Sequence, residues 1–217
     1  MNTHSTGHPA RLCLRAAVLV LLLCGAAGLS TFGDVVEIPD AKLATVLRSA
    51  LGKPSGDLLD TDLARLVSLH AGARDIANLE GLQYCVNLKR LWLFSNKIVN
   101  IEPLARLTKL WRLDLSGNQI VNVTALAGLK ELSVLDLSNN QVADIYSLTN
   151  LLQLTTVNLQ NNRIYDLAPL LNNPGLDSGD YIDLRGNQLF LVEGSTNMVD
   201  IQTLQDRGIG VDYEPRV

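Results

Sequence analysis

Three consecutive stretches of the chain follow one pattern: LKRLWLFSNKIVNIEPLARLTK at 88–109, LWRLDLSGNQIVNVTALAGLKE at 110–131 and LSVLDLSNNQVADIYSLTNLLQ at 132–153. The first leucine of each stretch belongs to a row with a spacing of 22, consisting of Leu66, Leu88, Leu110, Leu132, Leu154 and Leu176. Further apolar rows keep the same phase along the chain. Self-similarity at a fixed period of about 20–50 residues is the signature of a repeat architecture. The sequence therefore predicts a stack of similar coils.

The repeated unit is L-x-x-L-x-L-x-x-N-x-I-x-x-I-x-x-L-x-x-L-x-x. Its L-x-L core alternates with period two, which predicts a short strand with two apolar residues inward and one residue outward. The later apolar positions recur every three residues and indicate a 3₁₀-like or extended segment on the back of each coil. One unit cannot bury its own apolar side, so stability must come from stacked neighbours.

An asparagine recurs where the chain turns away from each predicted strand. Its amide carries donors and an acceptor. We expect it to satisfy backbone groups of its own turn and of the next coil, which would otherwise be buried without partners. The members of this structural row are Asn96, Asn118, Asn140, Asn162 and Asn187.

A second polar row precedes an inward apolar residue in each unit. Asn and Asp are preferred caps where a short helical turn begins, so we interpret the row as caps. A metal site is the alternative that we weigh and disfavour. The row consists of Asn78, Asn100, Asn122, Asp144 and Asp166.

The three quoted stretches resemble the leucine-rich repeats of bacterial internalins, whose repeats have the same length. The resemblance covers roughly residues 66–190. It implies an α/β solenoid, a right-handed horseshoe with short parallel strands on the concave face and 3₁₀ or extended segments on the convex side. It also implies protein recognition by the concave face, and it does not name the partner.

Both ends depart from the repeat. Residues 34–65 form a predicted helical cap, in which Asp40 and Gly52 suit the two ends of a first helix and a second short helix covers 61–67. Residues 191–217 form a predicted C-terminal cap with a helix and a short final strand, which would cover an exposed sheet edge. The helix is expected over 197–207 and the strand over 209–213, and the three extra residues before Asn187 fall within 172–180.

Residues 1–33 have the features of a secretory signal peptide. Arg11 and Arg15 form a basic flank, and an unbroken apolar run follows over 16–23. The whole apolar stretch of about 14 residues is shorter than the roughly 20 that a spanning helix needs. The alternative is an uncleaved signal anchor that tethers the protein to a membrane.

Cleavage is possible after Gly28 or Gly33, and we favour Gly33. The mature protein is then secreted or periplasmic and has no membrane span. A lipid anchor on Cys24 is disfavoured, because Leu23 stands where lipoprotein signals carry a small residue.

Composition narrows the possible partners. The 217 residues carry a formal net charge of −4 and no cluster of Lys and Arg. Nucleic-acid affinity depends largely on neutralising phosphates, so the sequence argues against a nucleic-acid partner. Cys85 would be the only cysteine after cleavage, and it takes a leucine position on the back of a coil, which indicates a core residue.

The register also predicts which side chains face outward from the strands. Aromatic and arginine side chains together are typical of interface hot spots. The predicted ligand-binding residues on the concave face are Arg90, Trp92, Phe94, Arg112, Asp114, Asp136 and Asn158. The central outward row also includes His70 and Asp183, and Trp111 lies at the edge. The alternative is that Trp and Arg only stack on each other or pack under the N-terminal cap.

Catalysis is disfavoured. His70 would be the only histidine of the mature chain, which excludes a histidine-rich metal site. Cys85 and His70 lie on opposite sides of the coil, too far apart for a nucleophile–base pair. We therefore predict a monomeric, non-enzymatic binding module for a protein or glycan ligand, without cofactor or metal. The alternatives are a structural envelope or matrix protein and, least favoured, a hydrolase that uses Asp114 and Asp136.

Overall fold

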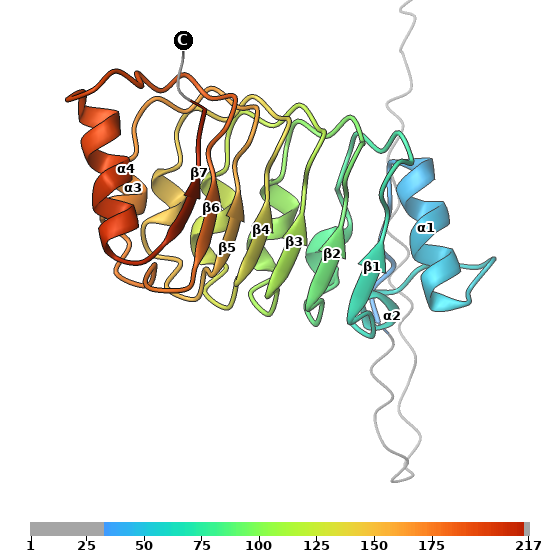
Figure 1. The fold of residues 1–217 in the computed structure, drawn as a ribbon. Helices are drawn as coiled ribbons and strands as arrows, with labels where there is room; N and C mark the ends of the chain where they lie inside the picture. The colour runs from blue at the N-terminus through green and yellow to red at the C-terminus, as the bar shows by residue number, and fades with distance from the viewer. Residues whose placement is uncertain (1–32, 215–217) are drawn as a thin grey trace, which may run out of the picture. The chain divides into compact units, whose positions relative to one another are not determined.

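A computed structural model describes residues 33–214 and contains one open sheet of parallel strands (Figure 1). The strands pair in chain order, each with the next, so no connection crosses the sheet. This arrangement confirms the predicted parallel solenoid. The strands are β1 (Ser68–His70), β2 (Arg90–Trp92), β3 (Arg112–Asp114), β4 (Val134–Asp136), β5 (Thr156–Asn158), β6 (Tyr181–Asp183) and β7 (Gly210–Asp212).

The register of the sheet repeats the period of the sequence. Trp92 lies opposite His70 on one side and Asp114 on the other. The middle residue of β1–β6 is buried, and its two neighbours face outward in all but the last of these strands. Since neighbouring strands lie about 4.8 Å apart, outward side chains that are 22 residues apart in sequence form contiguous rows.

The back of the coils consists of short helical segments, as the three-residue spacing predicts. Each begins after a residue of the Asn/Asp row, whose side-chain oxygen accepts the backbone N–H two residues further on at 2.8–2.9 Å. The segments are η1 (Leu82–Tyr84), η2 (Glu102–Arg106), η3 (Thr124–Gly128), η4 (Tyr146–Leu148) and the α-helix α3 (Ala168–Leu171).

The core is a continuous column of leucine, isoleucine and valine side chains between the sheet and these segments. Cys85 lies in this column and is fully buried. Within residues 33–214, no helix is both long enough and apolar enough to cross a lipid bilayer.

The asparagine row joins adjacent coils through buried hydrogen bonds. Nδ2 of Asn118 donates to the carbonyls of Leu115 and Ser116 in its own turn and to the carbonyl of Leu93 in the coil before it. Oδ1 of Asn118 accepts the N–H of Ile98, also in the preceding coil. Each member of the row bonds in this direction. The expectation that the amides would reach the next coil is therefore wrong, because the side chains point back along the stack.

The N-terminal cap is fastened to the first coil by one carboxylate. Oδ1 of Asp40 caps helix α1 (Ala41–Leu51) by accepting the N–H groups of Lys42 and Leu43. Oδ2 of Asp40 accepts the N–H groups of Ala77 and Asn78. Burial raises the pKa of Asp40, but these four donors outweigh it and hold the pKa below its ordinary value.

The second helix, α2 (Asp60–Leu63), is shorter than the expected 61–67. The carboxylate of Asp62 holds its first turn by accepting the N–H of Leu59 and pairing with Lys53 at 2.5 Å. After Leu63 the backbone tightens, because the N–H groups of Arg65 and Leu66 bond to carbonyls only three residues back.

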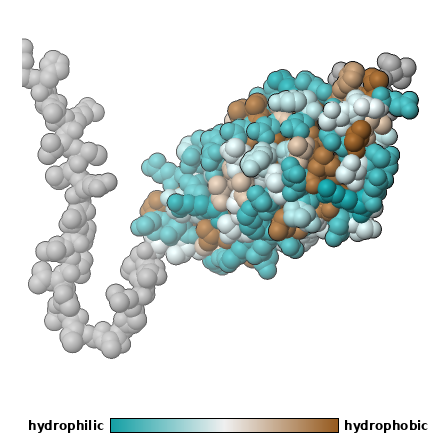
Figure 2. All heavy atoms as spheres, turned by 90° about the vertical axis from the view of Figure 1, so that its left-hand side faces the viewer, coloured by the Kyte–Doolittle hydropathy of each residue, from teal (hydrophilic) through white to brown (hydrophobic). Residues whose placement is uncertain are grey.

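The C-terminal cap contains α4 (Thr196–Asp206) and β7. The ends of both elements lie within one residue of the expected helix and strand. Ser195 caps α4 by accepting the N–H of Met198. The inserted loop is held by Asn173, whose fully buried amide donates to the carbonyls of Leu148 and Leu151. Seen from the side of α4, the surface is mainly hydrophilic with separate apolar patches (Figure 2).

We expect Asn118→Leu to lower the free energy of unfolding by about 1–3 kcal/mol, because four backbone groups lose a buried partner. Urea denaturation of the full chain measures the loss. The control is Asn150→Leu, since Asn150 is exposed and its side chain forms no hydrogen bond; we expect a change within about 0.5 kcal/mol. Equal stabilities of the two variants would contradict the role of the row.

Candidate binding face

The outward face of β1 and β2 carries a stack of two aromatic rings. The His70 and Trp92 rings lie with their centroids 3.9 Å apart and their planes at 14°. The register places these residues opposite each other in adjacent strands. Trp92 is half-buried, whereas His70 is exposed. The sequence placed both residues in one outward row but did not predict that their rings stack.

Two arginines flank this stack. The guanidinium carbons of Arg90 and Arg112 each lie 6.0 Å from the centroid of the Trp92 ring, at the outer limit of a cation–π contact. Both side chains are exposed, and within residues 33–214 neither forms an ion pair with a carboxylate. The Trp–Arg contact that was the alternative to binding is therefore present, but it leaves the charge of both arginines available.

Phe94 extends the aromatic surface and depends on a glycine in the adjacent coil. A Cβ on Gly72 would lie 2.4 Å from Cε1 of Phe94, so the ring covers the glycine. Phe94 remains 38% exposed and Trp111, at the edge of the face, 39%. We name His70, Arg90, Trp92, Phe94 and Arg112 the aromatic–arginine cluster.

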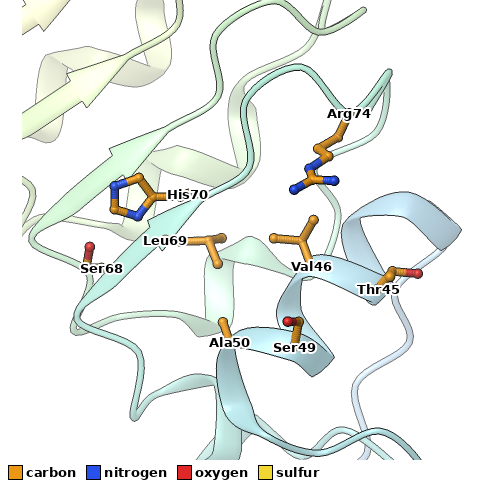
Figure 3. A pocket seen from close by; sticks show the side chains of 8 residues that line it. All are labelled: Thr45, Val46, Ser49, Ala50, Ser68, Leu69, His70 and Arg74. Carbon is orange, nitrogen blue, oxygen red and sulfur yellow. The ribbon is translucent and has the colours of Figure 1, made fainter.

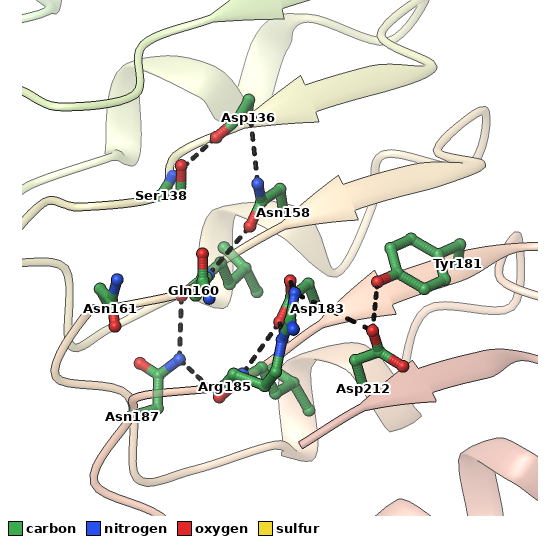
Figure 4. Close-up of polar contacts among 12 residues, drawn as sticks. Asp136, Ser138, Asn158, Gln160, Asn161, Tyr181, Asp183, Arg185, Asn187 and Asp212 are labelled. Carbon is green, nitrogen blue, oxygen red and sulfur yellow. Dashed lines mark hydrogen bonds and ion pairs between the residues drawn. The ribbon is translucent and has the colours of Figure 1, made fainter. Parts of the chain in front are cut away.

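The acidic residues further along the face are engaged in local hydrogen bonds. Oδ1 of Asp114 accepts the N–H and the hydroxyl of Ser116. Asp136 accepts the N–H of Ser138 and the side-chain amide of Asn158 (Figure 4). No hydrogen bond joins Asp114 to Asp136 in the described part of the chain. Asp114 and Asp136 are adjacent in the sheet, but each carboxylate accepts the backbone N–H two residues further along its own coil.

The last two strands carry two further carboxylates. Asp183 is paired with an arginine, and Asp212 accepts a tyrosine hydroxyl (Figure 4). Arg185 forms two bonds to the buried carboxylate of Asp183, at 3.0 and 2.5 Å. The Tyr181 hydroxyl donates to Asp212 at 2.6 Å. This bond, followed by burial and the negative charges nearby, raises the pKa of Tyr181 to about 12. From the sequence, only the outward register of these residues was predicted.

A cleft of about 430 Å³ lies between α1 and β1 and was not predicted from the sequence (Figure 3). His70 forms one wall, so the cleft continues into the aromatic–arginine cluster. Arg74 reaches toward the cleft from the loop after β1. Its lining residues are Thr45, Val46, Ser49, Ala50, Ser68, Leu69, His70 and Arg74.

In the described part of the chain, Cys85 and His70 are not brought together as a nucleophile and a base. Burial raises the pKa of the Cys85 thiol to about 12. His70 stacks on Trp92 at the sheet face, away from the core position of Cys85. Among residues 33–214, no group of three or more His, Cys, Asp and Glu side chains is placed to hold a metal ion.

Comparisons with known proteins identify the repeats. The family model described as leucine-rich repeats (2 copies) matches residues 86–129 and 108–150. An internalin structure, InlF from Listeria monocytogenes, matches 86% of this chain and 59% of its own, with a TM-score of 0.66 and 23% identity. Internalin C2 from the same species matches 81% of this chain and 94% of its own, with a TM-score of 0.55 and 29% identity. This chain thus spans less than two thirds of InlF, and no curated protein sequence matches it.

We expect iodide to quench Trp92 fluorescence efficiently in a Trp111→Phe variant, where Trp92 is the only tryptophan. The unpaired arginines attract anions at low ionic strength. Adding Arg90→Gln and Arg112→Gln should lower the ratio of the iodide to the caesium quenching constant about twofold. Arg106→Gln with Lys130→Gln removes the same charge near the convex segments and should leave the ratio unchanged. An unchanged ratio in the first pair would contradict an electropositive cluster.

We expect Cys85 to resist iodoacetamide at pH 8 in the folded protein, because its thiol is buried and its pKa is raised to about 12. The same residue should react within minutes in denaturing urea. Peptide mass spectrometry separates Cys85 from the other two cysteines of the chain. Rapid native labelling of Cys85 would show that the thiol is accessible.

Proposed function

We propose that this chain, whose repeats match the leucine-rich-repeat family model and whose fold is similar to that of Listeria internalins, is a secreted, non-catalytic binding module whose concave face recognises a protein ligand. Leucine-rich repeats stack into extended concave surfaces that suit the binding of macromolecules. The observation that carries the proposal is the aromatic–arginine cluster, whose residues lie on β1, β2 and β3 and, for Phe94, directly after β2.

The residue types in this cluster are those that contribute most of the binding energy at protein interfaces. Hot spots are enriched in Trp, Tyr and Arg and lie in well-packed surroundings. Trp92 is half-buried between His70 and the two arginines, so little side-chain freedom remains to be lost on binding. Phe94 adds exposed apolar area beside it. We assign Trp92, Phe94 and Arg112 as the anchor, with Arg90, Asp114, Asp136 and Asn158 around it.

A non-catalytic role is supported by the state of the reactive groups. The hydrolase alternative needs one of Asp114 and Asp136 to take up or release a proton during a reaction. Both carboxylates instead accept hydrogen bonds from residues two positions further on. The asparagine of the same row, Asn158, does the same for Gln160. A shared pattern in three coils indicates a structural role at the strand ends.

Export is proposed from the sequence of residues 1–33, of which all except Gly33 lie outside the described residues. The basic flank and the apolar run support a signal that is cleaved after Gly28 or Gly33. A membrane-tethered protein with an uncleaved signal anchor is the alternative. Capture experiments should therefore sample extracellular and envelope proteins.

A structural envelope or matrix protein remains the second candidate function, because the repeats alone provide a rigid shape. The lateral hydrogen bonds between coils, such as Ser133 to Thr155 and Asn161 to Asn139, favour rigidity over binding at those positions. They do not account for an exposed Phe94 beside a tryptophan. A glycan ligand is a further variant of the binding function, since aromatic rings also stack on sugars.

The full chain is first used to capture a ligand from the native surroundings. We expect the double variant Trp92→Ala, Phe94→Ala to bind that ligand at least about 30-fold more weakly, which corresponds to the loss of one strong hot spot of about 2 kcal/mol. Surface plasmon resonance with the captured ligand measures the change.

The matched control is Tyr146→Ala with Tyr165→Ala, because these aromatics are 70% and 63% exposed and lie away from the strands. We expect this pair to bind as the wild type does. A ligand that the strand pair retains would show that the anchor is wrong. If no protein or glycan binds saturably, the structural alternative is favoured.

A further inference from the structure

The cleft between α1 and β1 exists because only part of the apolar face of α1 is used for packing. Leu43 and Leu47 are fully buried, whereas Val46 is half-buried and Ala50 is exposed. The two latter residues line the cleft together with Leu69 (Figure 3). A cleft of about 430 Å³ falls within the roughly 300–1,000 Å³ of typical ligand pockets.

The cleft and the aromatic–arginine cluster share a residue. His70 lines the cleft, and its ring stacks on Trp92. A ligand that fills the cleft and passes over His70 therefore reaches Trp92 and the two flanking arginines. These features form one continuous surface at the N-terminal end of the concave face.

The surface has cations without counter-charges. Arg74, Arg90 and Arg112 form no ion pair with any carboxylate of residues 33–214. Nearby lysines differ, because Lys42 and Lys97 both pair with Asp75.

The nearest carboxylates are already engaged. Asp75 forms ion pairs with two lysines, and Asp40 accepts four backbone N–H groups from α1 and the first coil. Further along the face, Asp114 and Asp136 accept local donors, and Asp183 is paired with Arg185. Arg74, Arg90 and Arg112 have no carboxylate partner, so charge complementarity favours an anionic ligand at the N-terminal end. Further along the face, Asp114 and Asp136 keep their negative charge, because their hydrogen-bond donors are neutral.

We propose that the α1–β1 cleft and the aromatic–arginine cluster form one site for an acidic segment of a protein ligand. An apolar side chain of the segment enters the cleft between Val46 and Leu69, and neighbouring carboxylates pair with Arg74, Arg90 and Arg112. This inference rests on the proposed function and specifies the ligand's chemistry. Residues 1–32 of the same chain do not suit the site, because they contain no Asp or Glu.

The test is a selection of random dodecapeptides, displayed on phage, against the immobilised full chain. Enriched peptides should carry a net negative charge and at least one aliphatic or aromatic residue. A synthetic copy of the most enriched peptide, labelled with fluorescein, is then titrated by fluorescence polarisation. We expect its affinity to fall as salt rises from 50 to 500 mM, because the pairing groups are exposed, and to fall at least about tenfold when its acidic residues become amides.

Two variants test the two parts of the site. Arg74→Gln removes a cation, and Ala50→Phe fills the cleft from the exposed side of α1, and we expect each to weaken the peptide at least about tenfold. The matched controls are Arg106→Gln and Ala127→Phe, since both residues are exposed on convex segments and Ala127 lines a comparable cleft of about 310 Å³. The controls should bind as the wild type does.

The inference is overturned if no peptide is enriched, if the enriched peptides are neutral or basic, or if Arg74→Gln and Ala50→Phe bind them normally. Dimerisation of the wild type that Ala50→Phe abolishes would also overturn it, by making a second copy the occupant. These failures are distinct from failure of the proposed function. A captured protein ligand that requires Trp92 and Phe94 but not Arg74 or Ala50 would preserve the binding module and refute the acidic segment.

Discussion

The buried asparagine amide at the end of each strand is the contact on which the other features depend. A coil of 22 residues has to turn sharply after three residues of strand, and the turn leaves backbone groups inside the molecule. The Asn118 side chain satisfies four of them, two in its own turn and two in the coil before it. Unpaired, such groups would each cost about 1–3 kcal/mol. Asn96, Asn118, Asn140 and Asn162 bond backward by the same offsets, and Asn187 does so with its offsets lengthened by the three inserted residues, so each coil is held in register with the one before it.

A fixed register is also what makes the surface predictable. When residues 22 apart are neighbours, a short calculation from the sequence places Trp92 between His70 and Asp114 and assigns Phe94 to the row of Gly72. The strands, the short segments on the back and the N-terminal cap follow from the same period and from end signals such as Asp40 and Gly52. The parts that were missed lie where the period stops. At the end of α2 the backbone tightens to three-residue hydrogen bonds before the first repeat begins. The α1–β1 cleft depends on which of the apolar residues of α1 meet the first coil.

The hydrogen-bond partners of the outward carboxylates were harder to predict from the sequence than the positions of those residues. The sequence places Asp114 and Asp136 outward correctly, but it does not say whether they are free. A local signal was present, because each is followed two residues later by a serine, and a carboxylate at that spacing readily accepts the N–H. The pairing of Tyr181 with Asp212 joins residues 31 apart across the irregular end of the array and has no such signal.

The contacts between side chains of adjacent coils differ between the N-terminal end of the face and the rest of the stack. Further along the stack, several polar neighbours 22 residues apart bond to each other, as in the pairs Asp136–Asn158, Ser133–Thr155 and Gln141–Arg163. Such pairs use up their own polar groups. Along β1 to β3 and the residues directly after β1 and β2, the Phe94 ring lies over Gly72, His70 stacks on Trp92, and Arg90 and Arg112 have no carboxylate partner. The exposed part of the Phe94 ring and the charges of the two arginines, which have no carboxylate partner, contribute little to holding the coils together. Their cost is best explained by a ligand that covers the ring and neutralises the charge.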